Sequence, residues 1–343
     1  MRLLIITKTV DANDQLLGFS VNWFRRFAER FDLVTILCLE KGEFDLPDNV
    51  KVISLGKDKK HSKIRQLFTF YFLLFTLRKQ YDAAFSFMNA IWIVLGAWLW
   101  RLLNKKAYLW YAHKTITWKH HLAEKWADGI FTSTSEGFRI KSKKVMIVGQ
   151  GVDTDLFKSS DKKQEGGDRL KILSVGRIAS IKNYEVLLRA LKILDSQNID
   201  FSLTVIGEPV FLKDFEYEKR LKVIVSELGL DDKVSFLGKV AHDKLPSYYQ
   251  THTVLINLGK TGSLDKTIVE AMASGTTVIS SNEAAIKFLP KELVVSGDNA
   301  EELADKIKKI VGNDFSAELR EYVIKNHSLN NLVERITLRI KNV

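Results

Sequence analysis

The sequence predicts an α/β protein made of two doubly wound units, and three observations carry this prediction. Short apolar runs with the length of buried strands alternate with helical stretches along the chain, as at Leu3–Ile6, Leu170–Val175 and Val254–Leu258. The chain has 343 residues, which is long for one domain and comfortable for two. The polar, glycine-containing segment Ser159–Asp168 lies near the middle of the chain and marks the expected domain boundary.

The composition excludes several classes of protein. Apolar residues make up 46% of the chain and charged residues 27%, which is typical of a globular protein with substantial cores. The single cysteine, Cys38, excludes an internal disulfide framework and fits a cytosolic protein. The sequence has no Walker A motif, no G-x-G-x-x-G fingerprint and no zinc-type Cys/His cluster. These absences disfavour a nicotinamide dehydrogenase, and we predict no metal ligands.

The positive charge is concentrated in the first half of the chain. Residues 1–158 contain 25 lysines and arginines against 15 aspartates and glutamates, whereas the remainder contains 27 against 26. All seven tryptophans also lie in the first half. This asymmetry predicts that the N-terminal half meets something anionic. Because the charges are spread among apolar helices and no nucleic-acid-reading motif is present, we expect no nucleic-acid partner.

An apolar segment beside a basic one points to a membrane surface. Lys57–Arg65 is a basic run, and Leu67–Leu77 is almost wholly apolar. Its eleven residues fall well short of the roughly 20 that span a bilayer. The pair is typical of an interfacial anchor, but a helix buried between a sheet and its neighbours would show the same pattern. The apolar stretch Ala90–Leu103 has the same two interpretations.

The stretch Gly262–Ser281 has the pattern of a ligand-binding loop followed by a helix. It comes after the apolar run Val254–Leu258 and continues as a predicted helix that stops at Gly275. Loops at the carboxyl ends of parallel strands face the ligand, and the start of a helix presents N–H groups that suit phosphate. Glu270, on the helix, can accept hydrogen bonds from a ribose diol. The stretch predicts a nucleotide-diphosphate site, although an ordinary strand–loop–helix shares the pattern.

Two segments of the chain resemble a known family. The residues T-I-V-E-A-M-A-S-G around Glu270 resemble the donor-site segment of retaining nucleotide-sugar glycosyltransferases with the GT-B fold. The segment V-G-R-x-x-x-x-K-N, which contains Arg177 and Lys182, is similar to a second segment of that family and comes in the right order. Both basic residues follow the predicted strand Leu170–Val175, so they can converge on a diphosphate.

The resemblance implies a fold and a division of roles. It implies two Rossmann-like domains facing across a cleft, with an acceptor-side domain over 1–163 and a donor domain over 164–320. The last helix, about 321–343, would pack back on the first domain. Glu270 would hold the donor ribose, while Arg177 and Lys182 would stabilise the departing diphosphate without a metal or other cofactor. His113, in W-Y-A-H, is similar to a histidine that contacts the donor sugar.

The other candidate donor-binding residues are carried over in the same way, and one of them departs from the family pattern. They are Gly18, Gly207, Glu208, Val240, Gly262, Ser263, Leu264 and Asp265. Gly262 stands where the family has the first of its two glutamates, which touches the transferred sugar. Asp265 is close enough in the loop to substitute for it. The segment Gly262–Leu264 is expected to form the start of the helix.

The expected function is transfer of a hexose from a nucleotide diphosphate to an acceptor hydroxyl, with retention of configuration. The basic, tryptophan-rich first half predicts a lipid-linked or glycan acceptor and peripheral contact with the inner face of the cell membrane. A cytoplasmic enzyme of glycan, polysaccharide or glycolipid synthesis fits these features. The missing first glutamate at Gly262 keeps a second hypothesis open, a catalytically degenerate protein that binds a nucleotide sugar without transferring it.

Overall fold

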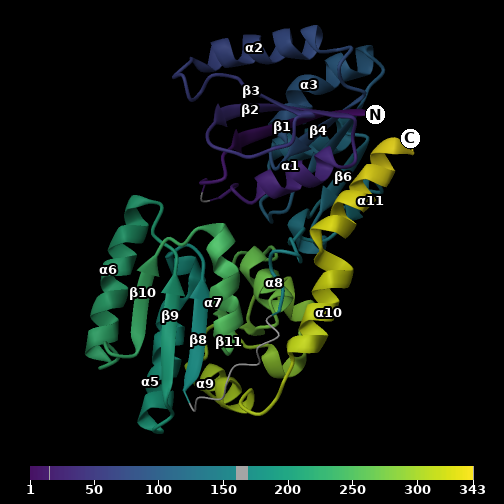
Figure 1. Ribbon diagram of the computed structural model, residues 1–343. Helices are drawn as coiled ribbons and strands as arrows, with labels where there is room; N and C mark the ends of the chain where they lie inside the picture. Colours follow the sequence, from purple (N-terminus) through teal and green to yellow (C-terminus); the bar gives the residue numbers. More distant parts are fainter. Residues whose placement is uncertain (15, 160–168, 343) are drawn as a thin grey trace. The chain divides into compact units, whose positions relative to one another are not determined.

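The computed structural model describes residues 1–14, 16–159 and 169–342, and the chain divides into two compact units (Figure 1). Unit 1 consists of Met1–Gly151 and the residues from Ser328 onward, and unit 2 consists of Val152–His327. The boundary expected at 163/164 lies outside the described residues, and the units divide between Gly151 and Val152 instead.

The C-terminal helical region belongs to both units. Helix α10 (Ser316–His327) is part of unit 2, whereas α11 (Leu329–Lys341) is part of unit 1. The two helices are separated at Ser328, whose side chain accepts a hydrogen bond from the Asn331 N–H and so caps α11. The stretch expected at 321–343 is therefore divided, and only its second part joins the first unit.

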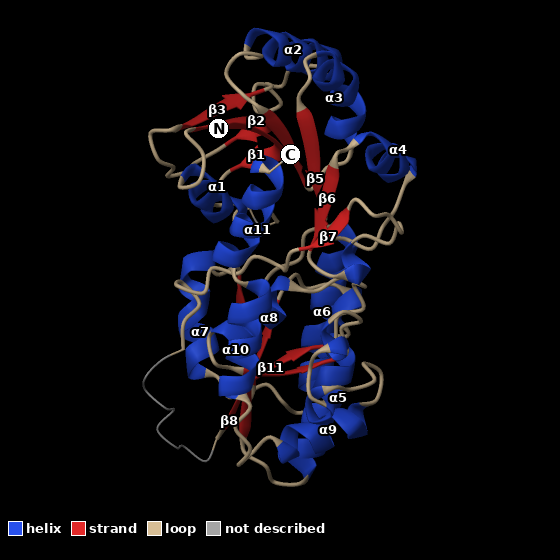
Figure 2. Cartoon of the chain, turned by 90° about the vertical axis from the view of Figure 1, so that its right-hand side faces the viewer, coloured by secondary structure: helices blue, strands red, loops and turns tan. Residues whose placement is uncertain are grey.

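Unit 1 contains a parallel sheet of seven strands among the described residues, in the order β3-β2-β1-β4-β5-β6-β7. The strands are β1 (Arg2–Val10), β2 (Leu33–Lys41), β3 (Val50–Ser54), β4 (Ala83–Phe87), β5 (Lys106–Trp110), β6 (Gly129–Thr132) and β7 (Val145–Ile147). Helices cover both faces (Figure 2), so the strands are apolar on both sides.

The two faces of this sheet have separate cores. Helices α1 (Ser20–Ala28) and α11 cover one face, where Trp23, Phe24 and Phe27 pack with Leu332 and Ile336. The apolar residues of α11 recur at helical spacing, which places them on this one side. Helices α2 (Lys63–Thr76), α3 (Ile91–Leu102) and α4 (Trp118–Trp126) lie on the other face.

Helix α2 is not the fully buried helix that one interpretation of the sequence allowed. Only Phe70 and Leu74 are buried, whereas Phe68 and Phe72 are 72% and 66% exposed. Ser62 caps the helix by accepting a hydrogen bond from the Arg65 N–H. Within the described residues, none of the helices combines the length and the apolar character needed to cross a membrane.

Unit 2 has a five-stranded parallel sheet in its described part, in the order β10-β9-β8-β11-β12. Its strands are β8 (Leu170–Val175), β9 (Phe201–Ile206), β10 (Val234–Gly238), β11 (Val254–Asn257) and β12 (Thr277–Ser280). Its helices are α5 (Tyr184–Ser196), α6 (Leu212–Glu227), α7 (Leu245–Thr251), α8 (Lys266–Ala273), α9 (Ala300–Lys309) and α10.

The strand order of unit 2 reverses between β8 and β11. From β8 the chain proceeds to β9 and β10 on one side, and then returns to β11 and β12 on the other. In doubly wound sheets a crevice opens at this point, outside the carboxyl ends of the two strands. The residues that follow Val175 and Asn257 are therefore the ones placed to meet a ligand.

Candidate functional site

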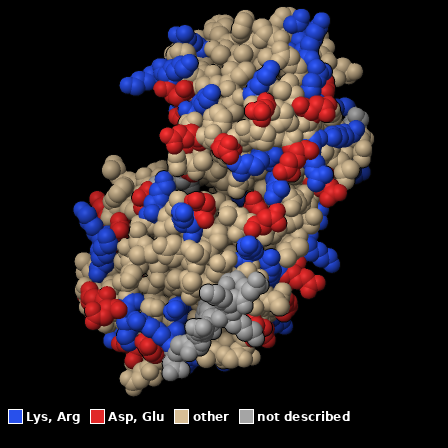
Figure 3. Space-filling view, in the orientation of Figure 1, with Lys and Arg blue, Asp and Glu red and all other residues tan. Residues whose placement is uncertain are grey.

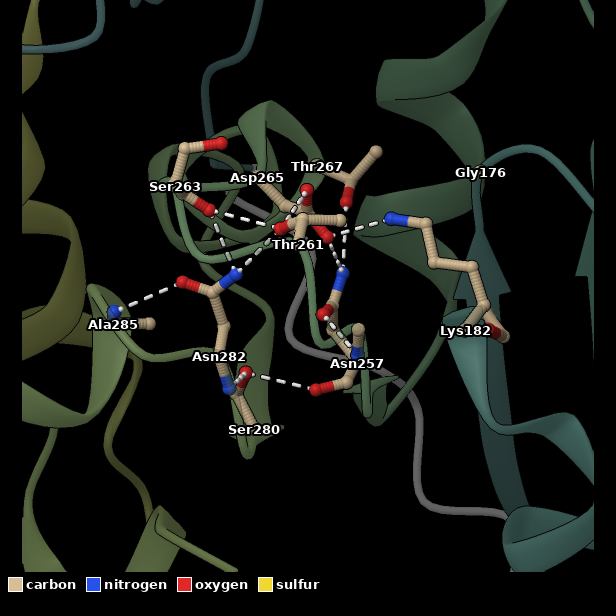
Figure 4. Close-up of polar contacts among 12 residues, drawn as sticks. Gly176, Lys182, Asn257, Thr261, Ser263, Asp265, Thr267, Ser280, Asn282 and Ala285 are labelled. Atoms are coloured by element: carbon tan, nitrogen blue, oxygen red, sulfur yellow. Dashed lines mark hydrogen bonds and ion pairs between the residues drawn. The ribbon is translucent and has the colours of Figure 1, made fainter. Parts of the chain in front are cut away.

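An ion pair joins the two loops at the reversal of the strand order. Lys182 follows β8, in the short turn that precedes α5, and Asp265 ends the loop that follows β11. The Lys182 Nζ lies 2.6 Å from the Asp265 Oδ2 (Figure 4). The two side chains are only 15% and 14% exposed. The structure thus brings together two residues that the sequence analysis selected from separate motifs.

Three further polar side chains hold this pair in place. The Asn257 Nδ2 donates to the Asp265 Oδ2 at 3.0 Å, and the Thr261 hydroxyl donates to Oδ1 at 3.1 Å. The Asn282 Nδ2 in turn donates to the Thr261 Oγ1 at 3.2 Å and to the Ser263 carbonyl at 2.9 Å. Asn257, the last residue of β11, and Asn282, two residues after β12, were missed from the sequence because an Asn at a strand end has no distinctive motif.

Helix α8 begins later than expected. The segment Gly262–Leu264, predicted to be the helix start, is part of the preceding loop, and the first helical residue is Lys266. Gly262 has a φ of +67°, a left-handed conformation that favours glycine and cannot belong to the helix. Ser263 and Leu264 are buried. The N–H groups at the start of the helix therefore belong to Lys266 and the residues after it.

Glu270 is a buried carboxylate with two side-chain donors. It is 2% exposed, its Oε1 lies 2.9 Å from the His242 Nε2, and its Oε2 accepts from the Tyr249 hydroxyl at 3.1 Å. Burial by itself raises the pKa of Glu270, but His242, Lys266 and Tyr249 together outweigh it and lower the pKa. The carboxyl group is therefore an anion in the folded protein.

Lys266 is the first residue of α8 and lies one helical turn before Glu270. Burial lowers the pKa of its ammonium group to about 8, and the negative charge of Glu270 opposes this shift. The start of α8 therefore has a basic side chain close to the helix N–H groups. The lowered pKa of Lys266 and the contacts of Glu270 with His242 and Tyr249 cannot be predicted from the spacing of residues in the sequence.

Arg177, directly after β8, is held by residues at the start of α6. It approaches the Asp214 Oδ2 at 3.7 Å and lies over the Phe211 ring at 5.0 Å from its centroid. Asp214 is buried and also accepts the Phe211 N–H at 3.3 Å. The guanidinium plane is thus oriented by an acid and an aromatic ring.

The loops after β8, β9 and β10 touch through their backbones. The Gly207 N–H donates to the Gly238 carbonyl at 2.8 Å, and the Ile178 N–H donates to the Glu208 carbonyl at 3.2 Å. A Cβ at Gly207 would lie 2.0 Å from the Gly176 carbonyl oxygen, so only glycine fits. Val240, two residues after β10, is half-buried beside these loops.

Two candidate residues, His113 and Gly18, belong to unit 1. The His113 N–H donates to the Gly137 carbonyl at 2.8 Å, and its Nδ1 accepts the Thr115 N–H at 3.1 Å. Burial lowers its pKa, so the ring is neutral near pH 7 and carries its proton on Nε2. Gly18 precedes α1, where a Cβ would lie 2.6 Å from the Asp14 carbonyl oxygen.

Solved structures define the class of fold. HepE (Alr3699) from Anabaena in complex with UDP aligns with a TM-score of 0.80 and 16% identity, over 100% of both chains. Sucrose-phosphate synthase from Thermosynechococcus elongatus aligns with a TM-score of 0.77 and 16% identity, over 99% of this chain and 98% of that one. At such identity the likeness shows the fold alone, which is the GT-B architecture of two Rossmann-like domains.

The family follows from the sequence of unit 2. A family model described as glycosyl transferases group 1 matches residues 155–329, just over half of the chain. The chain belongs to this family, as the two motifs around Arg177 and Glu270 predicted.

Curated relatives match over less than half of the chain. Mannosylfructose-phosphate synthase of Agrobacterium fabrum is 29% identical over 153 residues, which cover 42% of this chain and 34% of that protein. The lipopolysaccharide core mannosyltransferase LpcC of Rhizobium leguminosarum is 27% identical over 164 residues, 46% of this chain and 45% of that protein. The alignments thus span less than half the length of these relatives.

Proposed function

We propose that the chain transfers a sugar from a nucleotide-diphosphate donor to a hydroxyl group of an acceptor. One observation carries this proposal: Lys182 lies at the reversal of the strand order, paired with the residue that precedes α8. A cation and a helix start at this position suit a diphosphate. Membership of the glycosyl transferases group 1 family supports the same conclusion, and the similar HepE structures contain UDP or UDP-glucose.

In the proposed reaction the bond between the sugar C1 and the diphosphate oxygen breaks, and C1 bonds to the acceptor oxygen. The diphosphate leaves with the electron pair, and its oxygen takes the acceptor proton. Arg177, Lys182 and the N–H groups of α8 stabilise the negative charge that develops on the leaving group. Because these cations neutralise the charge, we propose that the reaction needs no metal. Retention of the anomeric configuration is proposed from the family resemblance.

Glu270 and His113 have binding roles in this proposal. The ribose role of Glu270 is proposed from the family resemblance. Because its carboxylate is buried and both oxygens already have protein donors, the ribose hydroxyls would share these oxygens or replace the His242 Nε2, whose side chain is partly exposed. The role of His113 as a contact to the transferred sugar is proposed from the family resemblance alone. Gly207, Glu208 and Val240 line the base side of the site, since they follow β9 and β10 at the same edge of the sheet.

We further propose that the acceptor is presented at a membrane. The exposed residues that we call the α2 surface are Ile64, Phe68, Phe72 and Phe75 of α2 with Trp98 and Leu102 of α3. Between Lys57 and Lys106 the sequence has ten lysines and arginines against two aspartates. The region of α2, along the top of Figure 3, is mainly uncharged with basic side chains at its ends.

An exposed aromatic face between basic residues suits the interface of an anionic bilayer. This arrangement favours a lipid-linked or glycan acceptor and a peripheral position on the inner face of the cell membrane. Synthesis of a polysaccharide, glycan or glycolipid is the corresponding role. Gly262 favours the second candidate function, a protein that holds a nucleotide sugar without transferring it.

The first experiment is a thermal-shift panel of nucleoside diphosphates and nucleotide sugars, without added metal and with EDTA. Stabilisation by one base series is expected, because a ligand that binds only the folded state raises its stability. The best donor then enters a transfer assay with membrane extracts as acceptor. If a nucleotide sugar binds but is neither transferred nor hydrolysed, the catalytically degenerate protein is favoured. If no nucleotide stabilises the protein, both candidate functions are contradicted.

A further inference from the structure

We propose that Asp265 is a positioning residue that holds the Lys182 ammonium toward the donor diphosphate, and that it does not contact the transferred sugar. This inference rests on the proposed function and deepens it. Asp265 is the acid nearest to Gly262 in the loop, and the sequence allowed it to replace the missing glutamate as a sugar contact. The contacts around it favour a different role.

Both oxygens of the Asp265 carboxylate already have donors within the protein. Oδ2 accepts from the Lys182 Nζ at 2.6 Å and from the Asn257 Nδ2 at 3.0 Å. Oδ1 lies 3.1 Å from the Thr261 hydroxyl, which shares its single proton between this oxygen and the Ser263 carbonyl at 3.0 Å. A sugar hydroxyl would have to displace one of these donors or share an oxygen with it. Since the side chain is only 14% exposed, little of the carboxylate is open to a new partner.

The Asp265 side chain lies at the N-terminal cap position of α8 but binds Lys182 and does not cap the helix. Asp265 precedes α8 with an extended conformation, where an aspartate side chain commonly accepts the N–H groups of the first turn. Its side chain makes no such capping bond. The carboxylate turns toward Lys182 instead, and the Ile268 N–H donates to the Asp265 backbone carbonyl at 3.2 Å.

A chain of side chains fixes Asp265 to the core of unit 2. Asn282, which is buried after β12, donates to Thr261, and Thr261 donates to Asp265. The four side chains Asn282, Thr261, Asp265 and Lys182 thus form one series of contacts across two loops. A lysine ammonium is a point charge on a flexible stem, and this series restricts where the Lys182 charge can lie.

The pairing has opposite effects on binding and on turnover. The Asp265 charge offsets that of Lys182, so removing it leaves a more positive site for a nucleoside diphosphate. Without Asp265, however, the ammonium is no longer directed, and a misplacement of about 1 Å can cost on the order of a hundredfold in rate. We therefore expect Asp265→Asn to bind the nucleoside diphosphate as tightly as the natural protein or more tightly, while kcat falls at least about tenfold.

The test compares Asp265→Asn, Asp265→Glu and the exposed control Asp232→Asn. UDP and GDP are titrated by calorimetry, and kcat and KM are measured with UDP-glucose, UDP-galactose and GDP-mannose. The inference predicts that Asp265→Asn lowers kcat, keeps or strengthens diphosphate binding, and preserves the order of preference among the sugars. Partial recovery of kcat in Asp265→Glu supports it further. A changed preference between the two C4-epimeric UDP-sugars would overturn it, as would an unchanged kcat.

A second measurement does not depend on activity. Thermal unfolding is followed for Lys182→Met, Asp265→Asn and the double variant, without nucleotide. Each single change leaves a partly buried charge unpaired, so the double variant should lose less than the sum of the two single losses. Strictly additive losses would overturn the inference. If the losses are not additive but the protein binds no nucleotide, the contact between Asp265 and Lys182 is confirmed and the proposed function is rejected.

Discussion

The His242 Nε2 lies 2.9 Å from the Glu270 Oε1, on a carboxylate whose other oxygen accepts the Tyr249 hydroxyl at 3.1 Å. His242 comes before α7 and Tyr249 lies within it, so α7 and the turn before it orient a side chain of α8. The buried acid is thereby kept ionised and held in one plane before any ligand arrives.

Removing the Tyr249 hydroxyl should destabilise unit 2. In Tyr249→Phe the buried, charged Glu270 loses a donor, and the expected loss is about 2 kcal/mol in the free energy of unfolding. Urea denaturation measures it, with Tyr248→Phe as the control on the neighbouring residue. A loss no larger than that of Tyr248→Phe would show that the hydroxyl contributes nothing to Glu270.

Changing Arg177 should affect turnover far more than stability. Arg177→Lys keeps the charge but loses the planar donor fork, so we expect kcat to fall about tenfold or more with the donor that the thermal-shift panel identifies. Stability should change little, since Asp214 keeps the Phe211 N–H as a partner. Arg189→Lys, on the exposed face of α5, is the matched control. Equal kcat in the two variants would remove Arg177 from the proposed mechanism.

The low pKa of Lys266 gives a stability difference that depends on pH. The folded protein has a pKa of about 8 at this group against an ordinary value of 10.5, so the unfolded chain binds more protons between these values. The contribution of this lysine to stability therefore rises with pH across that window. The free energy of unfolding of Lys266→Met, relative to that of the natural protein, should therefore be higher at pH 7 than at pH 10.

Urea denaturation of both proteins at the two pH values measures this difference. Lys213→Met, at an exposed position of α6, provides the control for general alkaline effects. If the difference between Lys266→Met and the natural protein were the same at both pH values, the lysine would have an ordinary pKa.

The α2 surface should bind anionic vesicles. The natural protein is expected to float with vesicles that contain anionic lipid at low salt, and less at high salt because the charges are screened. The double change Phe68→Asp and Phe72→Asp should abolish flotation. The control, Leu212→Asp with Val223→Asp, adds the same charges at exposed apolar positions of unit 2 and should still float. Flotation that persists in the α2 variant would place the contact elsewhere.

Gly207→Ala should be strongly destabilising, because its Cβ would lie 2.0 Å from the Gly176 carbonyl oxygen. Gly229 also has a positive φ, but a Cβ there meets nothing within 4 Å. Gly229→Ala should therefore cost only the backbone strain, on the order of 1 kcal/mol. Thermal unfolding of the two variants measures the difference, and similar losses would mean that the loops after β8 and β9 separate easily.

The sequence was informative about elements and motifs because periodicity and residue type report local structure. Strands such as Leu170–Val175 were predicted with the bounds that the structure has, and the motif order led to the glycosyl transferases group 1 family. The start of α8 was misplaced, since the left-handed Gly262 and the cap position of Asp265 are set by the loop and not by helical periodicity.

The partners of the site residues could not be predicted for a related reason. His242 lies 28 residues before Glu270, and Asp265 lies 83 residues after Lys182. Contacts at such separations depend on which strands are neighbours in the sheet. The exposure of Phe68 and Phe72 likewise required knowing which face of α2 packs on the sheet.

The division of the chain has a consequence for the order of synthesis. Unit 2 is continuous in sequence, and the Val152 N–H donates to the His327 carbonyl at 2.8 Å, so its two ends meet. Unit 1 is interrupted, and its core is incomplete until α11 supplies Leu332, Val333 and Ile336. During synthesis, residues 1–151 of unit 1 therefore emerge before unit 2, but the core of unit 1 is completed only after α11 has been made. Until α11 packs there, the apolar surface beside Trp23 is exposed to solvent, and a chaperone can bind it.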